Sequence, residues 1–207
     1  MTPQRKARIK AIAATRQPDL TVFMERVHKP HNVSAVLRTC DAVGVMRAHA
    51  VPVEGGLPKL NHTSGGAQRW VELQRHNDAA TGLEALKGQG FRLYAAHFSD
   101  TAVDFRRPDY TQPTVIVLGT EKHGVSADTS QRVDQHIIIP MHGMAQSLNV
   151  SVATALILYE AQRQRQLAGM YAPRPLTEEP WKGLAERWIQ RDLARFKNRP
   201  PDDSDSE

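Results

Sequence analysis

The stretch from Ile137 to Leu158 constrains the fold more than any other part of the chain. It begins with a run of isoleucines typical of a buried strand, passes through a loop at Gly143, and continues as a helix that is apolar on nearly all sides. Its polar residues are concentrated where loop becomes helix, at Gln146, Ser147 and Asn149. A helix N-terminus has free N–H groups and partial positive charge, so these residues are placed to orient a polar ligand. The simpler alternative is that Ser147 caps a core helix.

Length and composition limit the classes of protein that this chain can belong to. The chain has 207 residues, enough for a well-buried core, and 40% of them are hydrophobic. No apolar run reaches the roughly 18 residues of a membrane span, and the start lacks the apolar region of a secretory signal. The single cysteine, Cys40, excludes an intramolecular disulfide, and the histidines lack metal-ligand spacing. We expect a cytoplasmic protein without a metal site.

Basic residues are concentrated at both ends of the chain. The net charge is +5, and residues 1–16 hold five basic side chains and no acidic one. Residues 163–199 add nine more basic side chains. This pattern suits a polyanion bound across terminal helices, which favours a nucleic acid; the alternative is solvated helix faces. The arginines that we expect to contact RNA are Arg5, Arg8, Arg16, Arg163 and Arg165.

Predicted strands and helices alternate along the chain, which indicates an α/β fold with an open, mostly parallel sheet. The domains expected are a basic helix at 1–18, a main domain at 19–168, a basic helical extension at 169–199 and a disordered acidic tail at 200–207. The strands expected are 20–27, 48–53, 70–73, 91–96, 114–118 and 137–140; the helices expected are 3–16, 32–44, 78–88, 127–133, 148–166 and 177–198.

Four loops follow predicted strands, and in parallel sheets ligands bind beyond the carboxyl ends of the strands. If residues 28–32, 97–100, 119–124 and 141–149 converge, they bring together five candidate site residues: Asn32, Arg38, Glu121, Ser147 and Asn149. Each has a structural alternative. Arg38 suits a surface pair with Asp41, Asn32 suits a helix cap, and Glu121 suits a solvated turn.

Several common sites are absent from the sequence. It contains no Gly-x-x-x-x-Gly-Lys-[Ser/Thr] phosphate loop and no Gly-x-Gly-x-x-Gly dinucleotide fingerprint. Ser147 lacks the Gly-x-Ser-x-Gly elbow of many hydrolases. A nucleotide hydrolase, a dinucleotide-dependent oxidoreductase and a serine hydrolase are therefore disfavoured.

Three segments together resemble the SpoU/TrmH class of SPOUT RNA 2′-O-ribose methyltransferases. They are residues 28–44, 116–124 and 137–159, in that family's order and spacing. The resemblance implies the SPOUT fold, with helices flanking the sheet and a deep trefoil knot at about 115–160. It implies S-adenosylmethionine as the methyl donor, no metal, a homodimer packed through the knot region, and a tRNA substrate methylated at guanosine 18 of the D-loop.

The resemblance also assigns roles. Arg38 is expected at the reacting 2′-hydroxyl as its base. Because a guanidinium normally stays protonated, two alternatives are open: the pocket lowers the pKa of Arg38 greatly, or Arg38 binds a phosphate and steers the proton elsewhere. Asn32, Ser147 and Asn149 are expected to hold the ribose and Arg38, and Glu121 to orient the site. The backbone near Ala96, Gly119, Ile139 and Leu148 is expected to bind the adenosyl group. The alternatives are a ribosomal RNA 2′-O-methyltransferase and a non-catalytic RNA-binding or chaperone protein of the same fold.

Overall fold

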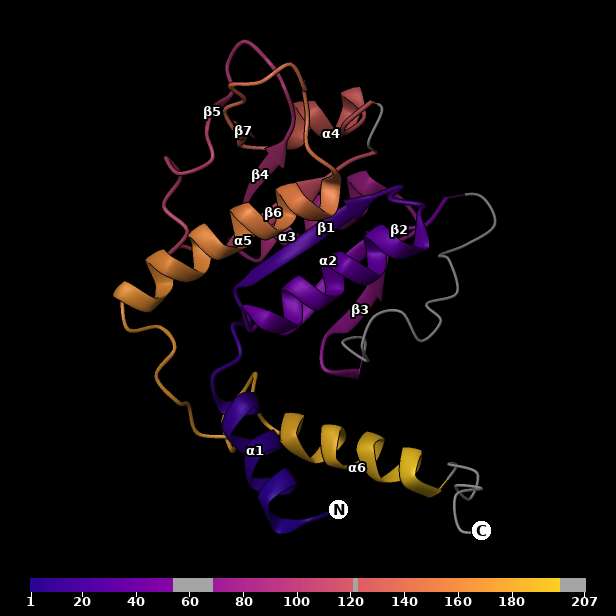
Figure 1. Ribbon diagram of the computed structural model, residues 1–207, viewed down its shortest axis with the longest axis vertical. Coiled ribbons are helices and arrows are strands. Elements are labelled where there is room, and N and C mark those ends of the chain that lie inside the picture. Colours follow the sequence, from indigo (N-terminus) through magenta and orange to yellow (C-terminus); the bar gives the residue numbers. More distant parts are fainter. Residues whose placement is uncertain (54–68, 121–122, 198–207) are drawn as a thin grey trace. The chain divides into compact units, whose positions relative to one another are not determined.

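The computed structural model describes residues 1–53, 69–120 and 123–197 (Figure 1). The chain forms two compact units. The larger comprises Gln17–Tyr171, and the smaller joins Met1–Arg16 to the segment that begins at Ala172. The acidic tail expected at 200–207 lies outside the described residues, as do most of the loop after residue 53 and the segment 121–122.

A sheet of seven strands, counted over the described residues, forms the centre of the larger unit. In the order β3-β2-β1-β6-β4-β7-β5, every pair of neighbours is parallel. The bounds are β1 Leu20–Glu25, β2 Arg47–Val51, β3 Glu72–Arg75, β4 Arg92–Ala96, β5 Val103–Asp104, β6 Thr114–Leu118 and β7 Gln135–Ile138. The expected α/β class with a mostly parallel sheet is confirmed, and β6 has the predicted bounds. The two-residue β5 is too short to give a periodic signal and was missed.

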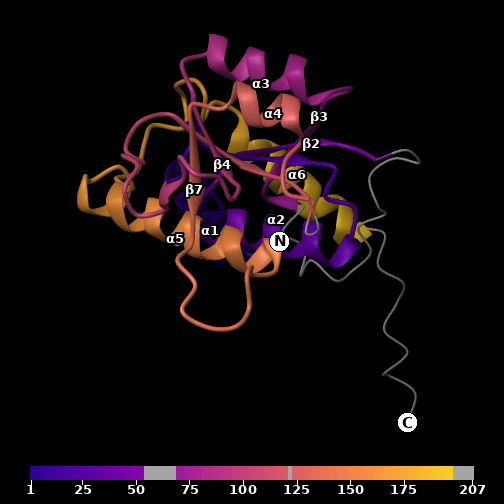
Figure 2. The same ribbon diagram turned by 90° about the horizontal axis from the view of Figure 1, so that it is seen from above.

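Helices cover both faces of this sheet, as Figure 2 shows. Those of the larger unit are α2 Pro30–Ala42, α3 Ala79–Gly88, α4 Ala127–Arg132 and α5 Val150–Leu167. α2 packs against α5 on one face, and α3 packs against α4 on the other. The expected knot region therefore comprises β6, α4, β7 and the first part of α5; the threading of the knot stays a prediction.

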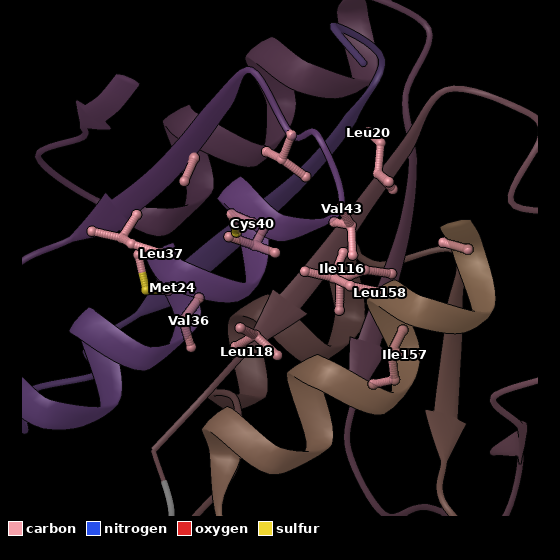
Figure 3. Packing of buried hydrophobic residues seen from close by; sticks show 14 of the residues in the cluster. Leu20, Met24, Val36, Leu37, Cys40, Val43, Ile116, Leu118, Ile157 and Leu158 are labelled. Atoms are coloured by element: carbon pink, nitrogen blue, oxygen red, sulfur yellow. The ribbon is translucent and has the colours of Figure 1, made fainter. Parts of the chain in front are cut away.

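The period-two alternation of the strands divides the core between the two faces. In β6, Ile116 and Leu118 join the cluster under α2 and α5, whereas the intervening Val117 joins the cluster under α3. Figure 3 shows Leu37 and Cys40 of α2 in the same cluster as Ile116 and Leu118 of β6. Ile157 and Leu158 of α5 belong to it as well. Each fully buried aliphatic side chain contributes about 1.5–3 kcal/mol. The cluster therefore fixes α2 and α5 on the sheet.

Two helix starts differ from the expectation, and both differences concern candidate site residues. α2 begins at Pro30, whose fixed φ suits the first helical position, so Asn32 is a buried residue of the first turn and not its cap. α5 begins at Val150, because Asn149, not Ser147, accepts the backbone N–H of Ser151 at 2.8 Å. Both corrections place the side chain of an asparagine at the carboxyl edge of the sheet.

The buried His49 of β2 contacts the half-buried His76, which directly follows β3. Nδ1 of His49 is 2.9 Å from Nε2 of His76, and both rings pack beside Phe23. Burial, together with the neighbouring His76 and Arg47, lowers the pKa of His49 from 6.5 to about 4. The folded protein therefore holds His49 neutral at a pH where the unfolded chain protonates it.

We expect the free energy of unfolding to fall as the pH drops from 6.5 to 4. In that window His49 is protonated in the unfolded state but still neutral in the folded state. Protonation of the unfolded state therefore lowers the free energy of unfolding, by on the order of 3 kcal/mol when the pH has reached about 4. Urea denaturation at pH 7 and pH 4.5 measures this. His49→Gln should flatten the pH dependence, whereas the exposed His142→Gln should leave it unchanged. If the stability of His49→Gln depended on pH as strongly as that of the wild type, the prediction would be wrong.

The smaller unit consists chiefly of two packed helices, α1 Pro3–Ala14 and α6 Leu184–Lys197. Arg5 of α1 forms an ion pair with the fully buried Asp192 of α6. The guanidinium carbon of Arg16 lies 4.8 Å from the centre of the Trp188 ring, and Trp181 donates its indole N–H to the Arg16 carbonyl at 3.0 Å. α6 starts later than the predicted residue 177, because Pro180 and Gly183, with φ of 67°, precede it.

Candidate functional site

The loops after β1, β6, β4 and β7 leave neighbouring strands at the same edge of the sheet. A cavity of about 780 Å³ lies at this edge and adjoins a second of about 340 Å³, with eight residues common to both. The shared lining residues are Ala96, His97, Phe98, Met141, Gln146, Ser147, Leu148 and Ala153. The size lies in the range of small-molecule sites.

 Of these eight, six lie in the connecting loops, while Ala96 ends β4 and Ala153 belongs to α5.

The four residues expected to bind a cofactor all line these cavities. Ala96 and Leu148 line both, Gly119 lines the larger and Ile139 the smaller. Ala96 is the last residue of β4, Gly119 directly follows β6, and Ile139 and Leu148 follow β7. The sequence therefore predicted the location of the cavity, although the assignment of these residues to a cofactor stays a prediction.

Three of the five candidate catalytic residues lie close together. Asn149 donates a side-chain N–H to the carbonyl of the Asn32 side chain at 3.1 Å, which joins the start of α5 to the start of α2. Ser147 lines both cavities, two residues before Asn149. Asn32 also borders a small recess beside Thr120 and Val150. The arrangement supplies amide and hydroxyl groups to anything bound at this edge.

The other two candidates are placed differently. Arg38 is exposed on α2, on the same helix face as His31 and Ala42, and it is not among the residues that line the two cavities. Glu121 lies outside the described residues, so its expected role is not addressed by the structure. Within one chain, the described part of the site thus holds the asparagines and the serine but not the arginine.

The turn after β6 is closed tightly. Thr120 and Gly124 exchange backbone hydrogen bonds of 2.8 and 2.9 Å. A Cβ on Gly119 would lie 2.0 Å from the carbonyl carbon of Gly124, whereas one on Gly143 would meet nothing within 4 Å. Only a glycine fits at position 119, and its bare backbone forms part of the cavity wall.

His97 is a lining residue that was not among the predicted site residues. Its ring packs at 5.3 Å against His136, whose two nitrogens contact the hydroxyls of Ser99 at 2.7 Å and Ser130 at 3.1 Å. Burial, and secondarily His136, lower the pKa of His97, which favours a neutral ring at the cavity. Its position directly after a strand was the only available signal.

Two of the expected RNA contacts need correction. Arg165 is 0% exposed and donates to the carbonyls of Tyr110, Asp19 and Gln112 and to the side chains of Gln17 and Asp19. Arg16 is 1% exposed beneath Trp188. Neither guanidinium faces solvent, because a positional charge pattern does not distinguish a buried arginine from a surface one. Arg8 is exposed, Arg5 pairs with Asp192, and Arg163 pairs with Glu160 on the surface.

Within the described residues, neither a metal-binding cluster nor a membrane-spanning helix is present. No group of three or more histidines, cysteines or acidic residues there is arranged to hold a metal ion. No helix in the same ranges has the length and apolarity needed to cross a membrane.

Comparison with known proteins gives consistent matches. The sequence pattern of the SpoU rRNA Methylase family matches residues 19–159. The tRNA (guanosine(18)-2′-O)-methyltransferase of Thermus thermophilus is 51% identical over 190 residues, which is 92% of this chain and 98% of that protein.

Two solved structures are also similar. The TrmH/SpoU tRNA modifying enzyme of Aquifex aeolicus has a TM-score of 0.86 at 43% identity, covering 92% of this chain and 97% of that one. The SpoU methyltransferase AviRb of Streptomyces viridochromogenes, solved in complex with AdoMet, has a TM-score of 0.66 at 26% identity, covering 74% and 64%.

Proposed function

The chain belongs to the SpoU rRNA Methylase family, and we propose that it transfers a methyl group from S-adenosylmethionine to the 2′-hydroxyl of guanosine 18 in tRNA. The observation that carries this proposal is the 51% identity, over 92% of the chain, to a methyltransferase named for that nucleotide. Because the proposed substrate, tRNA, is located in the cytoplasm, we propose that the protein acts there.

The cavity at the sheet edge fits the donor. Leu148 and Val150 offer apolar surface to an adenine ring, and the bare backbone of Gly119 allows close approach to a ligand. Gln146 and Ser147 offer polar groups in the same cavity. When bound, the donor supplies a methyl group that is already activated by a positively charged sulfur. The chain's own residues then have to position the ribose hydroxyl and assist the loss of its proton.

Positioning is the larger part of that task. Fixing two reactants in productive geometry can supply up to roughly 7–11 kcal/mol. Asn149, held by its hydrogen bond to Asn32 and by its cap on α5, presents a preorganised amide beside Ser147. We assign these three residues to holding the ribose. Their connection to both α2 and α5 makes this part of the site rigid.

Gly119→Ala is expected to remove donor binding and to lower the free energy of unfolding by about 1–3 kcal/mol, the usual cost of overpacking. The added methyl group would collide with the backbone of Gly124, so the turn must open. Isothermal titration with S-adenosylmethionine and thermal denaturation measure the two effects. Gly143→Ala is the matched control, since it lies in the same cavity with free space around it. If Gly119→Ala and Gly143→Ala had the same donor affinity and the same thermal stability, the prediction would be wrong.

We also propose that the protein is a homodimer through the outer surface of α5 and α2. α5 exposes Val152, Leu156 and Tyr159, which are spaced to lie on one helix face. Arg38 lies on the exposed face of the neighbouring α2. A second copy would cover the apolar stripe and bring Arg38 to the interface. Light scattering of Leu156→Asp tests this: the variant should be monomeric, and an unchanged mass would count against the interface.

The smaller unit is proposed to bind the tRNA backbone. Its exposed basic side chains include Lys6, Arg8 and Lys10 on α1, Lys182 shortly before α6, and Arg187 on α6. Arg5 of α1 and, in the larger unit, Arg163 of α5 stay in the proposal because both are exposed, although each is paired with a carboxylate.

We expect the affinity for tRNA to fall steeply with salt, by roughly a thousandfold between 50 and 200 mM if six phosphates are contacted. Fluorescence anisotropy over a salt series measures the slope. Replacing Arg8 with glutamine should reduce the slope by about one and should leave the donor affinity unchanged. A dissociation constant that does not respond to salt would remove the basic unit from tRNA binding.

Mapping the methylated nucleotide tests the proposed function directly. The protein is incubated with labelled S-adenosylmethionine and an unmodified tRNA transcript, and the label is located by nuclease digestion. Label at the 2′-hydroxyl of guanosine 18 supports the proposal. Label in ribosomal RNA alone would replace the substrate, and no label in either RNA would favour a non-catalytic RNA-binding protein.

A further inference from the structure

Phe98 is the most exposed aromatic side chain among those that the structure describes. Its side chain is 82% exposed. A fully buried phenylalanine contributes about 1.5–3 kcal/mol relative to an exposed one, so the folded chain leaves this stabilisation unused. Such an exposed ring is explained most directly by a ligand that covers it.

The ring lies at the rim of the candidate site. Phe98 lines both cavities, and it does so together with Ser147 and Gln146. A side chain that contributes to a cavity wall and is nevertheless open to solvent marks the mouth of that cavity. Phe98 therefore lies at the rim of the cavities that the exposed Ser147 also lines.

The residues on either side of Phe98 are both hydrogen-bonded to one strand, His97 through its backbone and Ser99 through its side chain. The N–H of His97 donates to the carbonyl of Ile137 at 3.2 Å, and the hydroxyl of Ser99 contacts Nδ1 of His136 at 2.7 Å. Both partners belong to β7, a strand within the sheet. The loop that carries the ring is thus held in place before a ligand binds. It therefore loses less conformational entropy when a ligand packs on the ring.

We propose that Phe98 is the stacking surface for the nucleobase at the methylation site of the RNA. This inference rests on the proposed function, since it takes the substrate to be RNA. A nucleotide whose ribose enters an enzyme pocket has its base unstacked from its neighbours, and aromatic side chains commonly replace the lost stacking. Phe98 offers an aromatic face next to the polar groups that would hold the ribose. The apolar stripe on α5, in contrast, is assigned in this proposal to a second copy of the chain.

Kinetics of three variants test this inference. Phe98→Ala removes the ring, Phe98→Leu keeps an apolar side chain without an aromatic face, and Phe98→Tyr keeps the face. The measurements are kcat and KM for an unmodified tRNA transcript, the dissociation constant for S-adenosylmethionine, and the molar mass in solution. Leu167→Ala, at a position that is 77% exposed on α5, is the control for loss of an exposed apolar side chain.

We expect kcat/KM for tRNA to fall roughly 5- to 150-fold in Phe98→Ala, the range for loss of one base–aromatic stack. Phe98→Leu should lose nearly as much, whereas Phe98→Tyr and Leu167→Ala should stay within about twofold of the wild type. Donor affinity and molar mass should not change, because the ring contacts neither the donor nor a second subunit in this proposal.

Each of the following results would overturn the inference. Full activity of Phe98→Leu would show that an aromatic face is not needed. Weakened donor binding with an unchanged KM for tRNA would make Phe98 a wall of the donor cavity. A changed molar mass would make it a subunit contact. Wild-type protein that methylates no RNA would overturn the proposed function as well, whereas an active wild type with an equally active Phe98→Ala would overturn this inference alone.

Discussion

Arg38→Ala is expected to lower kcat for methyl transfer by roughly a hundredfold to ten-thousandfold while S-adenosylmethionine still binds. Arg38 is exposed on α2 and is not part of the lining of either cavity, so its removal leaves the proposed donor site intact. We assign Arg38 to the RNA side of the reaction, where a guanidinium can hold a phosphate through paired N–H donors. Single-turnover methylation and titration calorimetry with the donor measure the two properties separately.

Arg38→Lys is the informative companion to this variant. Lysine keeps the positive charge but lacks the planar fork of donors, so it should recover little activity if paired contacts to a phosphate are required. Near-complete recovery would mean that charge alone is enough. Retained turnover in Arg38→Ala would remove Arg38 from the chemistry altogether.

Arg165→Met is expected to lower the free energy of unfolding by about 3–5 kcal/mol, the usual cost of breaking a buried ion pair on one side. The guanidinium of Arg165 makes five hydrogen bonds, at 2.6 to 3.1 Å, to groups of Gln17, Asp19, Tyr110 and Gln112. Methionine fills much of the same space but leaves these acceptors without a donor. Urea denaturation at neutral pH measures the loss.

Arg163→Met, two residues away on α5, is the matched control. Arg163 is exposed and pairs with Glu160, and exposed pairs contribute about 0–1 kcal/mol. This variant should keep its stability and lose affinity for tRNA, because its guanidinium faces solvent. The opposite outcome, a stable Arg165→Met with weakened tRNA binding, would mean that Arg165 is available to RNA after all.

The candidate site was only partly predictable from its residue pattern. Strands of a parallel sheet end at one edge, so the convergence of the loops 97–100, 119–124 and 141–149 on one cavity followed from their positions after strands. The choice of Ala96, Gly119 and Leu148 within that region came from the family resemblance. The cap of α5 was assigned to the wrong residue, since Ser147 and Asn149 are both good caps and local sequence does not distinguish them. His97 and Phe98 were missed because a histidine or phenylalanine after a strand has no distinctive pattern.

The sequence by itself determined the alternation of strands and helices, the parallel sheet and the edge at which the cavity lies, because hydrophobic periodicity and strand direction are local properties. Only the tertiary structure decided which charged side chains are buried. Arg165 and Arg163 are two residues apart on one helix, yet one is enclosed by carbonyls and the other faces water. The Ile137–Leu158 stretch shows the same division: its strand, loop and helix were readable locally, whereas the bond from Asn149 to Asn32 joins residues 117 positions apart. Contacts between distant parts of the chain depend on how the elements pack, which a local pattern does not encode.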